Sequence, residues 1–499
     1  MSAIITEKFR QHNATQFFES FTESSKSVYY LFIGKATAYT TATTTGSDSS
    51  PPTPADAVGE TEYYAWDSML AAKNIASSDI TYALPRRNWT NGTTYDMYEH
   101  NISSSNTSTS GASNIYDSTF YFLTSDNRVY KVLDNNAGTA YSGSEPTSES
   151  TSPFALGGYV LKYMYSITSS EAAKYLTSDF MPVSTDSTVS AAATDGKIES
   201  LIVTAGSGYT DGTYYAAVHG DGTSAGTRSG AIVRITISGG AIQSFGLTAG
   251  TDTTIHAGGS GYTFGYVNLG DDFIFSDASL SSSSSIGSGS NGAIEVIISP
   301  KGGHGNDAVA ELGGHYVMTA TTLTQAEGDD FTTANDFRSI GIVVDPTTFG
   351  TSTIASSSTA RQTYVVKIAT NSGTFEPDEV ITQASTGAVG KVVEFDSTRS
   401  LLFYQQEEFK GFGTVATSGN YVAFSGTNQI TGATSGATGT TAGTTETVTL
   451  LNSNTVTLTS GYANPELQAD SGNIIYLENR KPIQRASDQT EDIKVIIEF

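Results

Sequence analysis

The chain has 499 residues, too many for one compact core, and we therefore expect several domains. Its 50 acidic residues against 25 basic ones give a net charge of −25, which disfavours binding to the phosphates of nucleic acid. The absence of cysteine excludes disulfide frameworks and thiolate sites. The sequence has neither an export signal nor a run of 18 apolar residues, so we expect neither secretion nor a membrane span.

Residues 1–195 are predicted to form an N-terminal α+β domain. In "EKFRQHNATQFFESF" three of the phenylalanines recur at multiples of four, and in "TEYYAWDSMLAAKNI" Tyr63, Trp66 and Leu70 follow the i, i+3, i+7 spacing. Such spacing predicts two short helices, each with one buried face. Further along, "STFYFLTSDNRVYKVLDNN" places two apolar runs around a polar turn, the pattern of a β-hairpin.

The same domain contains the one compact basic and aromatic cluster of the chain, "LPRRNW". Arg86, Arg87 and Trp89 are residue types enriched at interface hot spots, because guanidinium groups and large rings retain binding energy when water is excluded. The alternative is that the arginine pair neutralises acidic neighbours within its own domain. The sequence favours neither interpretation.

Residues 196–350 are predicted to form a β domain with a duplicated unit. "KIESLIVTAGSGYT" recurs as "AIQSFGLTAG" and, after an interruption, "GSGYT". The glycines of each "GSGYT" can adopt positive φ in a turn, and Tyr209 and Tyr262 can close the turns by packing the ring and bonding the hydroxyl. The repeat is therefore interpreted as structural.

Residues 351–460 are predicted to form an inserted small β module, and residues 461–499 to supply closing strands. "VITQASTGAVGKV" and "QITGATSGATGTT" are a second duplication, within a stretch that has no charge between Lys410 and Glu446. Uncharged β-prone chains aggregate unless they fold or pack on a partner, so we expect a folded module. One hypothesis for this module alone is glycan binding through exposed aromatic residues, namely Tyr404, Phe409, Phe412 or Tyr421.

The motifs that usually carry chemistry are absent or incomplete. "GGHGNDAVA" resembles one calcium-binding β-roll repeat, but a single copy leaves an ion under-coordinated. "GSGSNG" is followed by a strand, not by the helix that a dinucleotide site needs. The adjacent acid pairs, such as Asp271 and Asp272, point to opposite faces of a strand. We therefore expect no catalytic residue, no cofactor, no metal site and no small-molecule substrate.

Charge is concentrated at the end of the chain. "NIIYLENRKPI" and "DIKVIIEF" read as two strands, with "QRASDQTED" between them. Arg480, Lys481, Arg485 and Asp488 are candidate interface residues, because mixed charge fixes register and partner choice. A solvated loop joining two strands is the open alternative, since exposed charge pairs stabilise little.

Several of these segments together resemble one known family. "IIYLENRKPIQRASDQTEDIKVIIEF", "ALPRRNW", "YDMY", "FYFLTSDNRVYKVLDNN", "GGYVLKYMYSITSSEAAKYLTSDFMPV", "KGGHGNDAVAELGGHYVM" and "TANDFRSIGIVVDP" look like the gene product eight family of baseplate wedge subunits from contractile-tailed, T-even-like phages. The resemblance implies a structural protein of the virion tail baseplate, assembled in the host cytoplasm as a homodimer that contacts other wedge proteins. It implies no catalysis, and residues 351–460 depart from the family pattern.

The composition, rich in glycine, tyrosine and phenylalanine, agrees with a mainly β fold, α+β overall, built of β-sandwich-like modules with a few short helices near the N-terminus. We predict a structural assembly protein that transmits rigid-body movement during tail contraction. The alternatives are a tail-associated polysaccharide depolymerase, suggested by the acid pairs and the Ser/Gly/Thr-rich strands, and a glycan-binding protein.

Overall fold

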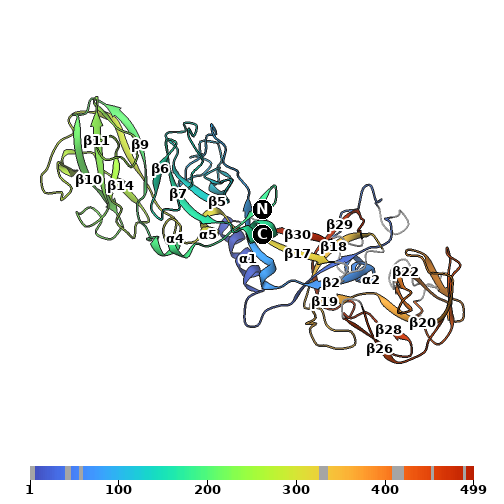
Figure 1. Cartoon of the computed structure of the whole chain (residues 1–499). Helices are drawn as coiled ribbons and strands as arrows, with labels where there is room; N and C mark the ends of the chain where they lie inside the picture. The colour runs from blue at the N-terminus through green and yellow to red at the C-terminus, as the bar shows by residue number, and fades with distance from the viewer. Residues whose placement is uncertain are drawn as a thin grey trace. The chain divides into compact units, whose positions relative to one another are not determined.

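The computed structural model describes residues 6–39, 46–55, 60–324, 335–406, 421–450, 454–486 and 490–499. Strands far outnumber helices in these parts, so the prediction of a mainly β fold is confirmed (Figure 1). The sandwich-like layering of the modules stays a prediction.

The chain divides into two compact units. The first unit comprises Met1–Thr15, Thr81–Met318 and Ile496–Phe499, and the second comprises Gln16–Ile80 and Thr319–Val495. The boundaries fall inside four continuous elements, which are α1 (Glu7–Glu19), β3 (Ile80–Pro85), β17 (Tyr316–Thr324) and β30 (Thr490–Glu498). The four-part division of the sequence predicted above, at 195, 350 and 460, stays a prediction.

One sheet of the first unit has the strand order β4-β5-β7-β6. Its strands are β4 (Tyr121–Leu123), β5 (Arg128–Asp134), β6 (Phe154–Leu156) and β7 (Tyr159–Ser166). The predicted hairpin is confirmed, because β4 and β5 pair antiparallel and Asn127 takes a φ of 62° in the turn between them. Aromatic residues of this sheet form a buried core.

A second sheet of this unit follows the path β12-β11-β10-β14-β16-β9, with β13 paired to β11 and β15 to β10. Its strands are β9 (Ser200–Ser207), β10 (Gly212–Gly220), β11 (Ile232–Ser238), β12 (Ala241–Ile242), β13 (Thr254–Ala257), β14 (Gly265–Val267), β15 (Ile274–Phe275) and β16 (Ser290–Ile297). The predicted role of the two tyrosines is confirmed. The Tyr209 hydroxyl accepts from the Gly292 amide at 3.0 Å, and the Tyr262 hydroxyl accepts from the Ala231 amide at 3.0 Å.

In the second unit, a five-stranded sheet has the order β19-β2-β1-β18-β29. Its strands are β1 (Tyr29–Gly34), β2 (Met69–Asn74), β18 (Phe337–Val344), β19 (Thr359–Arg361) and β29 (Asn473–Ile483). The helix predicted through Leu70 is wrong in its second half, because α2 (Glu60–Ser68) ends and β2 begins at Met69. Pairing of β2 with β1 overrides the helical spacing of the sequence.

A seven-stranded sheet in the same unit has the order β23-β22-β21-β24-β25-β20-β28. Its strands are β20 (Tyr364–Ser372), β21 (Val380–Gln383), β22 (Ala388–Asp396), β23 (Leu401–Gln405), β24 (Gln429–Gly432), β25 (Thr438–Thr441) and β28 (Tyr462–Ala463) (Figure 1). The second duplication is two hairpins, β21–β22 and β24–β25, which join through pairing of β21 with β24. Ile381 and Ile430 occupy equivalent, fully buried positions in them.

The remaining elements are short. They are η1 (Ser77–Asp79), η2 (Ile115–Asp117), α3 (Ser169–Tyr175), β8 (Phe180–Pro182), α4 (Ser187–Ala192), η3 (Asp271–Phe273), α5 (Ala308–Leu312), β26 (Glu446–Thr449) and β27 (Thr455–Leu458). β26 and β27 form a hairpin, and a four-stranded sheet has the order β30-β17-β3-β8.

Candidate interaction sites

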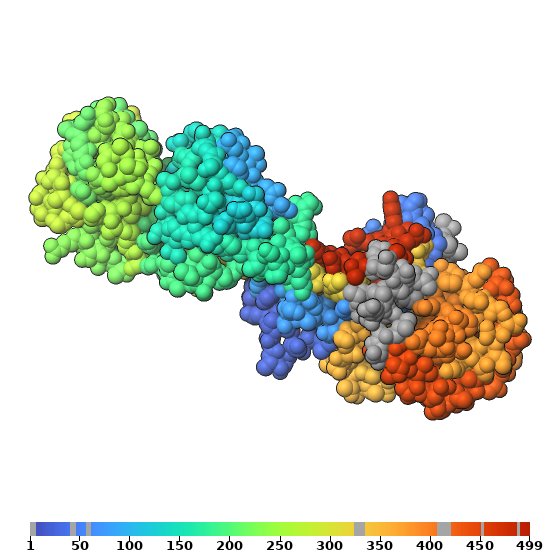
Figure 2. Space-filling model, viewed as in Figure 1, coloured from blue at the N-terminus to red at the C-terminus, as the bar shows by residue number. Residues whose placement is uncertain are grey.

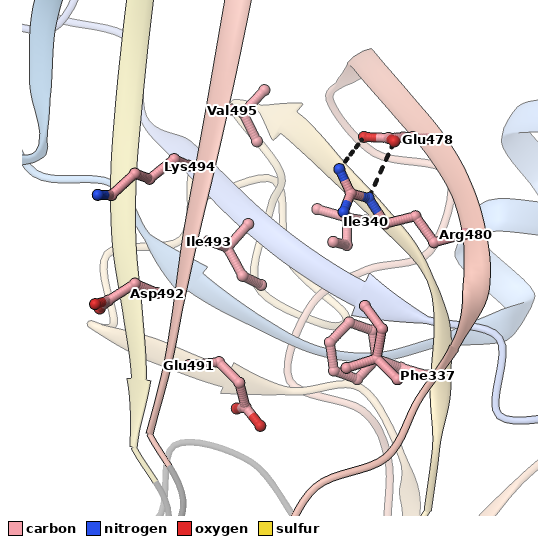
Figure 3. Close-up of a pocket in the computed structure, with 10 residues that line it drawn as sticks. Phe337, Ile340, Glu478, Arg480, Glu491, Asp492, Ile493, Lys494 and Val495 are labelled. Atoms are coloured by element: carbon pink, nitrogen blue, oxygen red, sulfur yellow. Dashed lines mark hydrogen bonds and ion pairs between the residues drawn. The ribbon is translucent and has the colours of Figure 1, made fainter. Parts of the chain in front are cut away.

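The charged C-terminal strands flank a cleft in the second unit. β29 is the end strand of the five-stranded sheet, and β30 is the end strand of the four-stranded one. The cleft between them has a volume of 410 Å³ and is lined by Phe337, Ile340, Glu478, Arg480, Ile483, Glu491, Asp492, Ile493, Lys494 and Val495 (Figure 3). The space-filling view shows the red C-terminal residues beside yellow residues from the middle of the chain (Figure 2). β29 and β30 therefore flank an indented surface.

The floor of the cleft is apolar. Phe337 and Ile340 reach it from β18, whereas Ile493 and Val495 reach it from β30 (Figure 3). All four side chains are buried. An apolar floor with a charged rim is the usual composition of a protein-binding surface.

An exposed ion pair forms part of the rim. The Arg480 guanidinium Nε lies 3.0 Å from Glu478 Oε1, and the Tyr476 hydroxyl donates to Glu478 Oε2 at 2.7 Å. These residues alternate along β29, so their side chains share one face of the sheet. Exposed pairs of this kind stabilise a fold by only about 0–1 kcal/mol.

A buried ion pair joins the end of β29 to the start of β30. Arg485 Nε donates to Glu491 Oε2 at 2.6 Å, and the Arg485 side chain is 0% exposed. Arg485 therefore ties the residues after β29 to the start of β30. Lys481 is exposed on β29, and Asp488 lies outside the described residues.

The predicted cluster Arg86, Arg87 and Trp89 lies in the first unit, at the end of β3. Arg86 donates from Nη1 to the Thr177 carbonyl at 2.7 Å and from Nε to Asn88 Oδ1 at 2.8 Å. These partners are a carbonyl and an amide, so the polar contacts of Arg86 are made inside its own unit but not to carboxylates. The interface role of the cluster stays a prediction.

Arg87 lines a second, polar cavity of 220 Å³ in the first unit. Its guanidinium lies 4.4 Å from the Tyr121 ring centroid, and Nη2 donates to the Tyr116 carbonyl at 2.9 Å. The buried Nη1 atom has no hydrogen-bond partner among the described residues, nor does the buried Nε1 of Trp89. The cation–π contact holds the guanidinium plane in place.

His315 lines the same cavity, and both of its ring nitrogens lack a hydrogen-bond partner in the described part of the chain. Its Nδ1 lies 3.7 Å from Glu7 Oε2, and its Nε2 lies 3.9 Å from Glu498 Oε1. Burial lowers the pKa of His315, so the ring is neutral at pH 7. The carboxylates of Glu7 and Glu498 and the guanidinium groups of Arg10 and Arg87 all line the cavity, so its lining carries both signs of charge.

The segment that resembles a calcium loop has a structural use instead. The Asp307 side chain accepts from the Ala310 amide at 3.0 Å and so caps the short helix α5. His304 is buried, and Gly302, Gly303 and Gly305 all take positive φ. The described residues contain no group of three or more His, Cys, Asp or Glu that could hold a metal ion. None of the described helices is long and apolar enough to cross a membrane.

Of the four aromatic residues named for glycan binding, the structure describes two, and the glycan-binding hypothesis stays a prediction. Tyr404 is buried, and Tyr421 bonds to Tyr364 and Gln406, whereas the two phenylalanines named with them lie outside the described residues. Sequence reasoning missed Phe337 and Ile340. No local signal could have found them, because they join the cleft only through the pairing of β18 with β29.

A family model described as "Bacteriophage T4, Gp8" matches residues 3–144 and 445–499. Residues 145–444 lie outside the match, so the likeness at "KGGHGNDAVAELGGHYVM" stays a prediction. No curated protein matches the chain. The charged residues of the rim, Glu478, Arg480, Glu491, Asp492 and Lys494, lie inside the matched part, whereas Phe337 and Ile340 of the floor lie outside it.

Proposed function

The chain belongs to the bacteriophage T4 Gp8 family and is a structural component of the tail baseplate wedge, and on this premise we propose that the cleft between β29 and β30 is one of its docking surfaces for another wedge subunit. The single observation that carries the proposal is an apolar floor beneath exposed charges in the matched C-terminal segment. Apolar burial supplies affinity in such a surface, and the charges restrict which partner fits.

The cleft suits a rigid docking mode. Its two walls belong to hydrogen-bonded sheets, and the Arg485–Glu491 pair fastens the connection between them. Docking on preformed walls costs little conformational entropy. We propose that the protein works as a shaped block, assembled in the host cytoplasm as a homodimer, and that it passes on rigid-body movement during contraction without chemistry.

The test is incorporation of purified full-length chain into wedges reconstituted with the other wedge proteins of the same phage. Arg480→Glu reverses an exposed charge on the rim, and Arg228→Glu makes the same change at an exposed position outside the matched residues. We expect Arg480→Glu to weaken incorporation about tenfold or more, as loss of an interface charge does, with an unchanged melting temperature. Equal incorporation of both variants and the wild type would refute the docking role of the cleft.

The homodimer is tested separately by mass measurement of the isolated chain in solution. A dimer that dissociates on dilution is the expected result. A monomer at all concentrations removes the homodimer proposal but leaves the cleft proposal intact, because the two rest on different measurements.

A further inference from the structure

Three exposed aromatic rings gather on the eight-stranded sheet of the first unit, in a part of the chain outside the family match. Phe264 is 56% exposed, Tyr266 is 54% exposed and Phe273 is 38% exposed. Neighbouring aromatic side chains that are exposed to solvent often mark a binding surface for a ligand or another protein. We refer to Phe264, Tyr266, Phe273 and His219 as the aromatic patch.

Strand register brings Tyr266, His219 and Glu295 together. Tyr266 on β14 pairs with His219 on β10 and with Glu295 on β16, so the three side chains stand on one face of the sheet. The His219 ring stacks on Tyr266 with centroids 5.4 Å apart and planes 23° apart. Phe273 meets the edge of His219 at 5.2 Å. The rings therefore support one another and keep fixed orientations.

The adjoining loop is fixed as well. The Asp221 carboxylate accepts hydrogen bonds from the backbone amides of Thr263 and Phe264, at 2.9 and 3.1 Å. These bonds hold Phe264 next to β14 although its ring is exposed. A ligand would meet a prearranged surface and would not have to order it.

The charge around the patch excludes polyanions. Residues 196–300 contain eight acidic residues and three basic ones, and four of the acids are Asp221, Asp271, Asp272 and Glu295 at or beside the patch. Such a field repels nucleic acid and acidic sugars. The ligand must therefore be neutral or positively charged.

The mixture of aromatic rings and carboxylates favours a sugar over a protein as the neutral partner. The buried centre of a protein interface is depleted of charged residues, whereas here Glu295 stands directly beside Tyr266 in the same row. A sugar has apolar ring faces that stack on aromatic rings and hydroxyl groups that donate to carboxylates. Glu295 already accepts from Asn101 Nδ2 at 2.9 Å, which holds it in place and leaves its second oxygen as an acceptor.

We propose that the aromatic patch binds a neutral carbohydrate, with sugar rings stacked on Tyr266 and Phe264 and hydroxyl groups donating to Glu295. This site goes beyond the wedge-assembly role and does not depend on it. It also differs from the glycan site expected from the sequence, which was placed in residues 351–460.

The test is calorimetric titration of the full-length chain with neutral oligosaccharides of glucose, galactose and N-acetylglucosamine, and with a uronic acid oligomer for comparison. We expect at least one neutral oligomer to bind and the acidic oligomer not to bind. Tyr266→Ala should weaken binding about tenfold or more, because stacked rings supply much of the contact. Tyr266→Trp should retain it.

Phe349→Ala is the matched control, since Phe349 is an exposed ring in the second unit, and it should bind as the wild type does. An unchanged melting temperature for Tyr266→Ala separates loss of binding from loss of fold. The proposal is overturned if no neutral oligomer binds, or if Tyr266→Ala binds as well as the wild type. Capture of a protein subunit through Tyr266, without sugar binding, would equally overturn it.

Discussion

Lys131 and Glu311 form a buried ion pair in which Lys131 Nζ lies 2.9 Å from Glu311 Oε2 and the two side chains are 0% and 2% exposed. Lys131 comes from β5 and Glu311 from α5, 180 positions later in the chain. The second oxygen of Glu311 accepts from the Gly305 amide at 2.7 Å. The pair therefore fastens the loop before α5 to the aromatic sheet.

Removing one partner of this pair should be costly. Burial lowers the pKa of Lys131, and Glu311 offsets part of that effect, so Glu311→Gln leaves a buried ammonium without its counter-charge. We expect a loss of about 3–5 kcal/mol in the free energy of unfolding, measured by denaturant titration. The double variant Lys131→Met, Glu311→Leu should recover part of this loss. A loss no larger than that of the exposed-pair variant Glu478→Gln would contradict the expectation.

Asp134 should make stability fall between pH 4 and 6. Burial raises the pKa of Asp134 to about 6, from an ordinary value of 3.8. The folded state thus holds the proton more tightly than the unfolded state, so its contribution is full below pH 4 and is lost as pH rises through 6. Asp134→Asn keeps the acceptor for the Asn136 amide. At pH 7 the variant should be more stable by about 3 kcal/mol, whereas at pH 3.5 the difference should vanish. Parallel pH profiles of the two proteins would count against this.

Two glycines with the same backbone geometry should respond differently to substitution. Gly196 and Gly239 have φ of 61° and 64°, but a Cβ on Gly196 would lie 2.1 Å from the Tyr262 nitrogen, whereas one on Gly239 meets nothing within 4 Å. Gly239→Ala should cost about 1–2 kcal/mol for the left-handed conformation alone. Gly196→Ala should lower the free energy of unfolding clearly more, because the backbone at Tyr262 must move to make room for the added methyl group. Thermal unfolding of both variants measures the two losses of stability. Equal losses would show that the close approach of the Tyr262 backbone to Gly196 is unimportant.

Glu379 should hold the second of the duplicated hairpins. Its buried carboxylate accepts from the backbone amides of Thr434 and Ser435, at 3.1 and 3.0 Å, and from that of Glu376 at 2.8 Å. Burial by itself would raise the pKa of Glu379, but these bonds outweigh it and the pKa is lowered. The stabilisation is therefore present above the ordinary pKa of 4.5 and is lost as pH falls.

Glu379→Gln should accordingly lower the free energy of unfolding by about 1–3 kcal/mol, since the NH₂ of the glutamine side chain would face backbone N–H groups, which are donors too. Hydrogen exchange in residues 429–441 at pH 7 is the local readout, and those amides should exchange faster in the variant. Glu376→Gln, at an exposed position three residues earlier, is the control and should leave exchange unchanged. Equal exchange in Glu379→Gln and the wild type would rule out the proposed anchor.

The local sequence pattern was sufficient to predict the structure where residues close in the sequence also contact one another in the fold. The hairpin around Asn127 follows from a polar turn between two apolar runs at short spacing. The hydroxyl partners of Tyr209 and Tyr262, the amides of Gly292 and Ala231, lie far away in the sequence and could not be read from it. The helix predicted through Leu70 exists as α2 but ends at Ser68, because the residues from Met69 onward pair with β1. A helical spacing of apolar residues does not reveal pairing with a distant strand.

By itself, the sequence determined the β character of this protein, the hairpin around Asn127 and its family, because each depends on short-range pattern or on whole segments that resemble known ones. Only the tertiary structure decided where the sites lie. The floor of the cleft joins Ile340 to Ile493, and the aromatic patch joins His219 to Tyr266, through hydrogen-bonded strands and packed walls that bring together distant parts of the chain. Strand partners are chosen by the summed burial and hydrogen bonding of whole sheets, which no single stretch of residues contains.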